Sequence, residues 1–265
     1  PGTYYVYAIV NPDPGVDCRP VQEIAVTVSN CDYGDLPAPY NTLIAGSGPH
    51  HAIVTGLQIG ATIDAETNGQ PSALANGDGA DEDGISAFPL FSAGSPANIN
   101  VSVLNTLSPS TPATLYGFID WNNDGDFLDA DETASIAVPS GTNGTVTLLF
   151  NVPGTAVQGM NLGARFRLST AAGLTADGMA PNGEVEDYLV QVAPCSASLT
   201  AAPGACAPAT NTHTLTGAVT LVSPPVSGTL TVSVSGGGSQ VFTAPFTSPL
   251  NYSISGLNSD GVSHN

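Results

Sequence analysis

The feature that most restricts the fold of this chain is the acidic segment at residues 120–132, DWNNDGDFLDADE. Side chains that carry oxygen occur at its positions 1, 3, 5 and 7, glycine at position 6, an apolar residue at position 8 and carboxylates at positions 12 and 13. A loop with this spacing surrounds Ca²⁺, because alternate side chains point inward and the glycine permits the sharp turn. The alternative is a solvated acidic turn, since Asp, Asn and Gly favour turns without any metal. The predicted ligands are Asp120, Asn122, Asp124, Asp126, Asp129, Asp131 and Glu132.

The sequence on both sides of this loop predicts strands and not the helices of an EF-hand. Residues 114–119 read TLYGFI, a run that favours β-structure. Residues 135–138, SIAV, end at a proline that is followed by a turn. We therefore expect the loop to connect two strands, as a hairpin or a longer connection that binds the metal.

The charge of the chain favours a cation as partner. Its 265 residues include 22 Asp and Glu but only three basic residues, Arg19, Arg165 and Arg167, which gives a formal net charge of −19. Salt bridges cannot neutralise so many carboxylates, whereas bound Ca²⁺ can. The same charge argues against nucleic acid or an anionic membrane as partner. Four cysteines in a β-rich composition favour an extracellular or cell-surface protein, and no apolar run approaches the ~20 residues of a membrane span.

Charge and strand pattern together divide the chain into three parts, residues 1–31, 32–193 and 194–265. Eighteen of the 22 acids lie in the second part, and the third contains only Asp260. Short alternating runs separated by turns predict an all-β fold, with a β-sandwich in the second part and an immunoglobulin-like sandwich in the third. The expected strands are 4–10 and 24–29, then 98–104, 114–119, 144–152, 163–169 and 188–192, then 212–222, 228–235, 240–243 and 250–255.

The third part has too few strands for a complete sandwich. Roughly four or five are expected there, whereas an immunoglobulin-like module has about seven. The two strands of residues 1–31 match this deficit, and two strands alone are marginal in water. We expect them to close such a module, either within one chain or, by strand complementation, in a neighbouring repeat or copy of the protein. The chain would then be one unit of a longer tandem array, and the open module favours complementation between units.

A series of short motifs runs through residues 32–188. In order they are DYGDLP at 32–37, IDAE at 63–66, GQP at 69–71, DEDG at 81–84, the loop with Trp121, ARFRLS at 164–169 and GEVEDY at 183–188. With these motifs the chain resembles the GEVED domain of large secreted bacterial surface proteins. The flanking segments look like the immunoglobulin-like repeats that accompany such domains. The resemblance implies a secreted, calcium-rich, multidomain adhesin or appendage protein, and it implies no defined ligand.

A second group of acids needs compensation for its charge. Glu184 and Glu186 share one face of an extended strand and repel each other unless a cation or a proton lies between them. We expect other acids of the domain beside them, so that the set forms a second Ca²⁺ site. Alternatively, Arg165 and Arg167, alternate residues on one strand face, pair with some of these carboxylates. The candidate residues are Asp64, Glu66, Asp81, Glu82, Asp83, Glu184, Glu186 and Asp187.

The cysteines are expected to form structural disulfides. Local bridges, Cys18–Cys31 and Cys195–Cys206, are one arrangement. Bridges between the two pairs are preferred here, because they would join the parts of one sandwich and close longer loops. The adjacent His50 and His51 are interpreted as part of a turn, since no third metal ligand lies at suitable spacing.

These observations favour a structural function. We expect a calcium-stabilised repeat or subunit of an extracellular bacterial filament or surface adhesin, whose partners are neighbouring copies of the same protein or repeat. The rival interpretation is a calcium-dependent carbohydrate-binding or adhesive module, with extracellular glycans as partners. A sugar-binding site would need exposed aromatic side chains on which the sugar ring can stack, but the only Trp of this chain lies within the acidic loop. A secreted hydrolase is the weakest alternative, because its acid would need an apolar site, and we expect no enzymatic activity.

Overall fold

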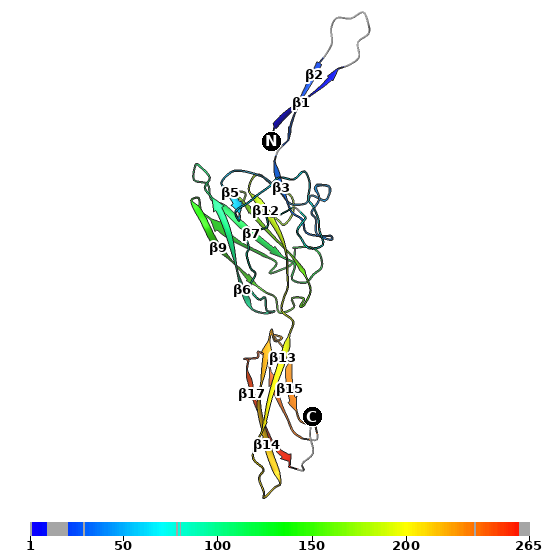
Figure 1. The fold of residues 1–265 in the computed structure, drawn as a ribbon, viewed down its shortest axis with the longest axis vertical. Coiled ribbons are helices and arrows are strands. Elements are labelled where there is room, and N and C mark those ends of the chain that lie inside the picture. The colour runs from blue at the N-terminus through cyan, green and yellow to red at the C-terminus, as the bar shows by residue number, and fades with distance from the viewer. Residues whose placement is uncertain are drawn as a thin grey trace, which may run out of the picture.

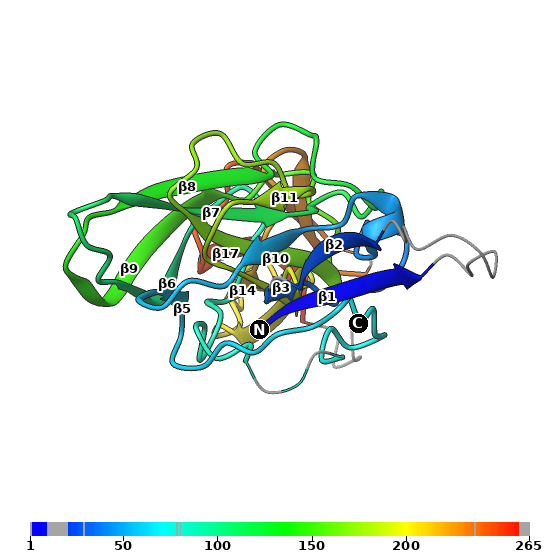
Figure 2. The same cartoon turned by 90° about the horizontal axis from the view of Figure 1, so that it is seen from above.

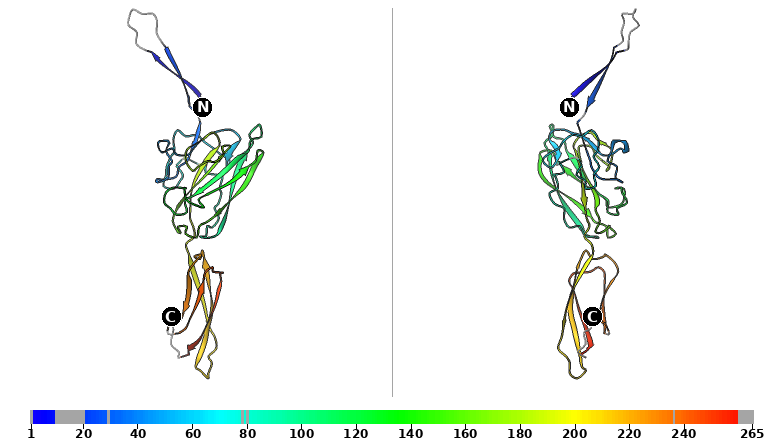
Figure 3. Two further views of the ribbon diagram at one scale, coloured as in Figure 1. Left: turned by 180° about the vertical axis from the view of Figure 1, so that it is seen from behind. Right: turned by 45° about the vertical axis from the view of Figure 1, so that its right-hand side comes forward.

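The computed structural model of the chain describes residues 2–9, 21–28, 30–77, 79, 81–235 and 237–259, the first two ranges by their backbone alone. The described residues form seventeen β-strands, one short 3₁₀ helix, η1 (Ile44–Gly46), and no α-helix. The expected all-β fold is thus confirmed. Figures 1 and 3 show three parts along the long axis: a two-stranded hairpin, a large central domain and a smaller C-terminal module.

The hairpin consists of β1 (Gly2–Ile9) and β2 (Val21–Val28), which pair antiparallel from Gly2 opposite Val28 to Ile9 opposite Val21. Its sheet contains no other described strand. The hairpin projects from one end of the central domain, whereas the C-terminal module lies at the other end (Figure 1). Seen along the long axis, the hairpin and strand β9 lie on opposite sides of the view (Figure 2). In this structure, β1 and β2 therefore do not close the C-terminal module of the same chain.

The central domain is a sandwich of two antiparallel sheets. One sheet has the strand order β12-β10-β7-β8 and the other the order β5-β6-β9. Apolar residues of both sheets form one continuous core that includes Ile99, Leu115, Trp121, Phe150 and Phe166. The strands are β5 (Leu57–Ile59), β6 (Pro96–Asn105), β7 (Ala113–Ile119), β8 (Thr133–Val138), β9 (Thr142–Asn151), β10 (Leu162–Ser169) and β12 (Glu184–Val190).

Strand β6 shows how the alternation of residues in the sequence determines which side chains face the core. From Pro96 to Leu104 the side chains that face the core, Ala97, Ile99, Val101 and Val103, alternate with outward residues. An alternation of period two places one set of side chains on the core face of a sheet. The strand pairs with β9 along its whole length, from Pro96 opposite Asn151 to Asn105 opposite Thr142.

Strand β10 is buried on both of its faces. Leu162, Ala164, Phe166 and Leu168 face the core between the sheets. Arg165 and Arg167 lie on the other face, which is covered by a small sheet of order β11-β4-β3 and by the loops beside it. This sheet comprises β3 (Cys31–Tyr33), β4 (His50–Ala52) and β11 (Met179–Ala180). The second covering layer places polar side chains in the interior, where each needs a partner.

The C-terminal module has two sheets, of order β13-β14-β17 and β15-β16. Its core is small, with Val219, Val232, Tyr252, Ile254 and Leu257 as its fully buried apolar residues. The strands are β13 (Ser196–Pro203), β14 (Thr212–Val222), β15 (Thr229–Ser233), β16 (Ser239–Thr243) and β17 (Leu250–Asn258). Every residue of the edge strand β13 is exposed.

Two sequence predictions are wrong. His50 and His51 lie on strand β4 and not in a turn, and His51 is fully buried. Among Cys31, Cys195 and Cys206, the cysteines that the structure describes, no disulfide is formed. Cys31 begins β3, which lies at the hairpin end of the central domain in Figure 1, whereas β13, which starts at the residue after Cys195, lies beyond the opposite end. Disulfide geometry requires the two Cα atoms to be close neighbours. Cys18 lies outside the described residues.

Candidate functional site

The acidic loop connects β7 to β8, which pair antiparallel with Phe118 opposite Thr133. The expectation that it joins two strands is confirmed. Asp120, at its start, is fully buried. Its Oδ2 accepts hydrogen bonds from the Tyr40 hydroxyl at 2.8 Å and from the Gly125 amide at 2.9 Å, and its Oδ1 accepts one from the Asp124 amide at 3.2 Å. Asp120 thus holds the first turn of the loop.

The end of the loop is fixed by Glu132, which is also buried. Its carboxylate accepts hydrogen bonds from the backbone amides of Trp121 at 3.0 Å and Asp129 at 3.1 Å. Burial, opposed by the Asp129 amide, raises the pKa of Glu132 to about 7. The Trp121 indole donates to the carbonyl of Asp131 at 3.0 Å while its ring packs in the core against Phe91 and Phe150.

Gly125 permits the close approach of this loop to a neighbouring segment. Its φ is +94°, and a Cβ atom at this position would lie 2.2 Å from Cγ of Pro39. Any side chain at position 6 of the loop would therefore be strained and would also clash.

Between these two buried ends, three exposed carboxylates converge. Asp124, Asp126 and Asp129 each place one oxygen within 4.8 Å of the others. The Asn122 side-chain amide donates to Asp124 Oδ2 at 3.1 Å and to Asp129 Oδ2 at 2.6 Å, so it also faces this group. Asp131 contributes its backbone carbonyl to Trp121 and is not in the group. The structure thus divides the seven predicted ligands into an exposed converging set, the two buried residues Asp120 and Glu132 that shape the loop, and Asp131, which is exposed outside the set.

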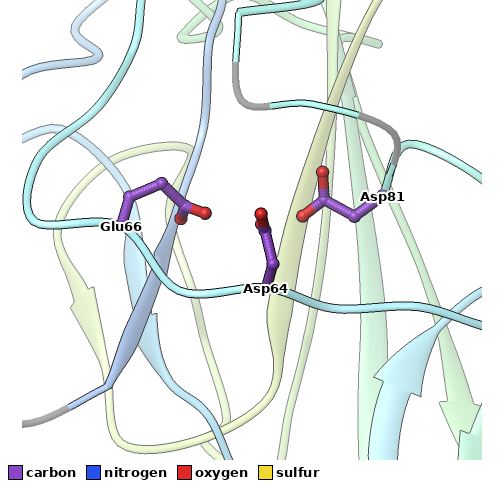
Figure 4. A group of neighbouring side chains, drawn as sticks. All are labelled: Asp64, Glu66 and Asp81. Carbon is purple, nitrogen blue, oxygen red and sulfur yellow. The ribbon is translucent and has the colours of Figure 1, made fainter.

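A second group of carboxylates lies at the hairpin end of the central domain. Asp64, Glu66 and Asp81 each place one oxygen within 4.8 Å of the others, and their carboxylates point toward a common space (Figure 4). The Glu66 backbone amide bonds to the carbonyl of Cys31 at 2.9 Å, and Glu66 Oε2 accepts from the Tyr33 amide at 3.1 Å. Strand β3 thus holds Glu66 in place. Burial, followed by interaction with Asp64, raises the pKa of Glu66 to about 8.

Glu184, the first residue of β12, is fully buried, and the charge of Asp81 from this group acts on it. Its Oε2 accepts a hydrogen bond from the Ile59 amide at 2.5 Å. Its Oε1 is buried and has no donor within hydrogen-bond distance. Burial first, then the charges of Asp32, Glu186 and Asp81, raise the pKa of Glu184 to about 12. Both glutamates therefore lie where a negative charge has too little compensation from the protein.

Other predicted members of this second set have separate roles. Glu186 Oε1 accepts from the amides of Asp83 at 3.1 Å and Gly84 at 2.9 Å, and its Oε2 accepts from the Tyr188 hydroxyl at 2.9 Å. Burial nevertheless raises the pKa of Glu186 to about 8. Asp83 accepts hydrogen bonds from the Ala61 amide and the Thr62 hydroxyl. Glu82 is half-buried and outside the group of three.

Asp187 is neutralised by an arginine, which was the alternative prediction. Arg165 donates from Nε to Asp187 Oδ1 at 2.7 Å and from Nη2 to Oδ2 at 2.9 Å, and both side chains are fully buried. The same Oδ2 accepts the backbone amides of Asp35 and Leu36. This bidentate pair connects β10 and β12 to the segment after β3.

Backbone carbonyls and a histidine hold the Arg167 guanidinium. Its guanidinium donates to the carbonyls of Thr175, Asp177 and Gly178 and, from Nε, to His51 Nε2 at 3.0 Å. His51 Nδ1 lies 2.9 Å from the carbonyl of Asn182, so the proton is on Nδ1 and Nε2 accepts. Burial and the neighbouring Arg167 hold the pKa of His51 well below its usual range, and burial lowers the pKa of Arg167 to about 10.

Sequence reasoning missed three residues of these networks. His51 was interpreted as part of a turn. Tyr40 supports Asp120 from a segment more than seventy residues away in sequence. Asp32 is buried and accepts the Val185 amide at 2.6 Å, which connects β3 to β12. The motif at residues 32–37 was a usable signal for Asp32, whereas a lone tyrosine in a loop carries none.

Comparison with known families assigns this geometry to a recognised type of domain. Residues 114–191 match the family model of the GEVED domain. The match extends from β7 through the end of β12 and includes the acidic loop and both described arginines. The predicted family is therefore confirmed for these residues. A comparison with curated proteins found no match for the chain. No helix among the described residues is long and apolar enough to cross a membrane.

Proposed function

Because the chain contains a GEVED domain, we propose that it is a calcium-stabilised, non-catalytic unit of an extracellular bacterial filament or cell-surface adhesin. Neighbouring copies of the same protein or repeat are its partners, and strand complementation joins them. The observation that carries this proposal is the arrangement in Figure 1: a hairpin without further sheet partners at one end and a sparsely packed β module at the other.

The C-terminal module supports the proposal by its exposed apolar surface. Strand β13 is exposed over its whole length, and it includes Leu199, which is 59% exposed. On the smaller sheet Val241 is 58% exposed. A sheet edge with free backbone groups and nearby apolar side chains accepts an additional strand.

The hairpin supports the proposal from the other side. Residues 4–10 read YYVYAIV, and a two-stranded sheet is at best marginally stable in water. In the described residues β1 and β2 pair only with each other. Docking of this hairpin on the module of a neighbouring unit would give it the further strands and the apolar surface that it lacks.

Bound Ca²⁺ is the second component of the proposal, and the exposed oxygen atoms of the acidic loop suit this ion. Ca²⁺ takes six to eight oxygen ligands at about 2.3–2.6 Å, so two ligands of one ion lie at most about 5 Å apart. Asp124, Asp126 and Asp129 meet this spacing, with Asn122 beside them and solvent available for water ligands. In this role Asp120, Asp131 and Glu132 shape the loop.

The two rival functions have less support. A sugar-binding surface uses exposed aromatic rings, whereas Trp121 is 1% exposed and lies in the core. A hydrolase would use a carboxyl group with a raised pKa as its acid. Glu184 has one, but this side chain is fully buried, where a glycosidic bond cannot reach it.

The assembly part is tested by light scattering and negative-stain microscopy of the 1–265 chain in Ca²⁺. We expect concentration-dependent oligomers or fibres, which a chain that begins at residue 32 does not form. Added peptide 1–31 should shorten the fibres, and a peptide with Val6 and Ala8 replaced by Asp should not. A 1–265 chain that stays monomeric at all concentrations would contradict strand complementation.

A further inference from the structure

We infer that Asp64, Glu66 and Asp81 form a separate site for a hard divalent cation such as Ca²⁺, with the buried carboxylate of Glu184 near Asp81. The site would connect the long segment between β5 and β6 to strands β3 and β12. This inference rests on the calcium part of the proposed function and is independent of how units assemble.

The geometry of the three carboxylates fits one ion. They come from two points of the β5–β6 connection that lie fifteen residues apart in sequence, and their oxygens lie within 4.8 Å of one another. Figure 4 shows the three side chains pointing toward one space from two backbone segments, one that carries Asp64 and Glu66 and one that carries Asp81. Asp81 is buried and Asp64 is exposed, so the space has a closed and an open side. Residues 64–70 line a pocket on the open side, which gives access to an ion and to its water ligands.

Two buried oxygens point independently to a missing positive group. Glu184 is fully buried, and its Oε1 has no donor within hydrogen-bond distance. Oε1 of Glu66 is likewise buried without a donor, although Oε2 of the same residue has one. A buried carboxylate oxygen without a partner is costly. The charge of Asp81 acts on both of these glutamates.

The protein has no described side chain that could supply the charge. The chain contains no lysine, and Arg165 and Arg167 are engaged with Asp187, His51 and backbone carbonyls on the other side of β10. As far as the described residues go, this leaves a proton shared between Asp64 and Glu66 as the competitor of a cation. A proton would compensate one carboxylate, whereas a divalent ion compensates two and can also attract Glu184.

The position of the site gives it a structural role. The connection from Ile59 to Pro96 contains no helix or regular strand among its described residues. Connections of this length are uncommon in compact domains unless something fixes them. An ion held by Asp64, Glu66 and Asp81 would fix two points of this segment, and the Glu66 contacts to Cys31 and Tyr33 extend the link to β3.

The test is the number of Ca²⁺ ions bound per full-length chain, measured by equilibrium dialysis and elemental analysis, with thermal unfolding in parallel. We expect two classes of site in the natural protein. Glu66→Gln should remove one class or weaken it at least tenfold, and Asp124→Asn should affect only the other. Glu82→Gln removes the same charge outside the group of three and should leave both classes unchanged.

Thermal unfolding in a chelator separates a cation from a proton. The side-chain amide that Glu66→Gln introduces can donate to Asp64 or Asp81, so this variant should melt at a higher temperature than the natural protein without Ca²⁺ and show a smaller Ca²⁺-induced rise. Asp81→Asn is the second variant, in case Glu66→Gln does not fold. If both variants bind Ca²⁺ with unchanged number and affinity, the group holds a shared proton and the inference is wrong. Fibre formation is scored separately, so its absence would contradict only the assembly proposal.

Discussion

Glu184 and Asp187 lie on the same short strand, β12, but their buried carboxylates have very different numbers of hydrogen-bond donors around them. Asp187 accepts two hydrogen bonds from Arg165 and two from backbone amides, so its charge is fully compensated. Glu184, three residues earlier, has a single backbone donor on one oxygen and other acids nearby. The motif that names the domain therefore combines a structural ion pair with a residue whose charge needs an external partner.

The Arg165–Asp187 pair should be essential for stability. Arg165→Ala leaves a buried, uncompensated carboxylate, so we expect a loss of about 3–5 kcal/mol in the free energy of unfolding, measured by urea denaturation. Asp177→Asn is the matched control, because Asp177 contacts the same arginine but its side chain is 37% exposed, and we expect a loss of less than about 1 kcal/mol. Similar effects of both variants would mean that Arg165 acts mainly through the loop at 176–177.

The exposed part of the acidic loop should carry its metal dependence. Removal of Ca²⁺ by a chelator should lower the melting temperature, because an ion that binds only the folded state stabilises it by about 2.7 kcal/mol at one hundred times its dissociation constant. Asp124→Asn should remove the share of this response that belongs to the loop. Asp131→Asn is the control, since it removes the same charge outside the converging group, and asparagine tolerates the φ of +69° found there. Equal losses from both variants would indicate general electrostatics instead of a site.

At the scale of elements, β12 and the β5–β6 connection should make the metal-free protein lose stability as the pH rises from about 4.5 to 8. The folded-state pKa values of Glu66 and Glu186 are about 8, against an ordinary value of 4.5. The folded state therefore binds more protons than the unfolded state between these limits, so stability is fully present below about pH 4.5 and is lost as the pH rises through 8.

Bound Ca²⁺ should remove this loss, because it replaces the protons as the compensating charge. We expect the difference in melting temperature between Ca²⁺-saturated and chelated protein to grow from pH 5 to pH 8, by roughly 3 °C or more. Ca²⁺ should also release protons on binding at pH 7, measurable in weakly buffered solution. A difference that does not vary with pH would show that the glutamates are already ionised in the metal-free fold.

Strands with a period-two alternation were predictable from the sequence. Strand β14 was expected at 212–222, where it occurs, and β6 and β10 were expected to within two residues at each end. Their apolar residues recur at alternate positions, so one face must be buried. The hairpin around the acidic loop was also predictable, because its turn residues and both flanking strands agree.

Elements whose burial depends on distant partners were not predictable. The expected strand at 188–192 begins four residues earlier, at Glu184, because partners from distant segments support this part of the strand. Arg165 neutralises Asp187, backbone amides donate to Glu184 and Glu186, and Asp32 accepts the Val185 amide. The strands β3, β4 and β11 are two or three residues long and carry no periodicity. For the same reason the choice among eight candidate acids required the structure: only the fold shows that Arg165 neutralises Asp187 and that Glu66 meets Asp81.

At the scale of the whole molecule, the central domain and the C-terminal module have separate hydrophobic cores and contact each other at a small junction. Val226 of the C-terminal module packs against Gly94 and Gly154 of the central domain. A Cβ atom at Gly94 would lie 2.2 Å from one Val226 methyl group, and a Cβ atom at Gly154 would lie 2.7 Å from the other. Ser223 bonds to Ser92 at 3.0 Å across the same junction. The core of the central domain is the larger one, and both carboxylate groups lie within that domain.

Calorimetry should therefore resolve two unfolding transitions in the monomeric chain. The C-terminal module, with its small core, should melt at the lower temperature and be insensitive to Ca²⁺, whereas the transition of the central domain should move upward with Ca²⁺. Val226→Ser should lower only the first transition, because it removes the apolar contact at the junction and leaves the carboxylates unchanged. A single transition that moves as a whole with Ca²⁺ would mean that the junction couples the two cores into one cooperative unit. In that case Val226→Ser should split the transition in two, and a unit in an assembly would transmit calcium binding from its central domain to its neighbour.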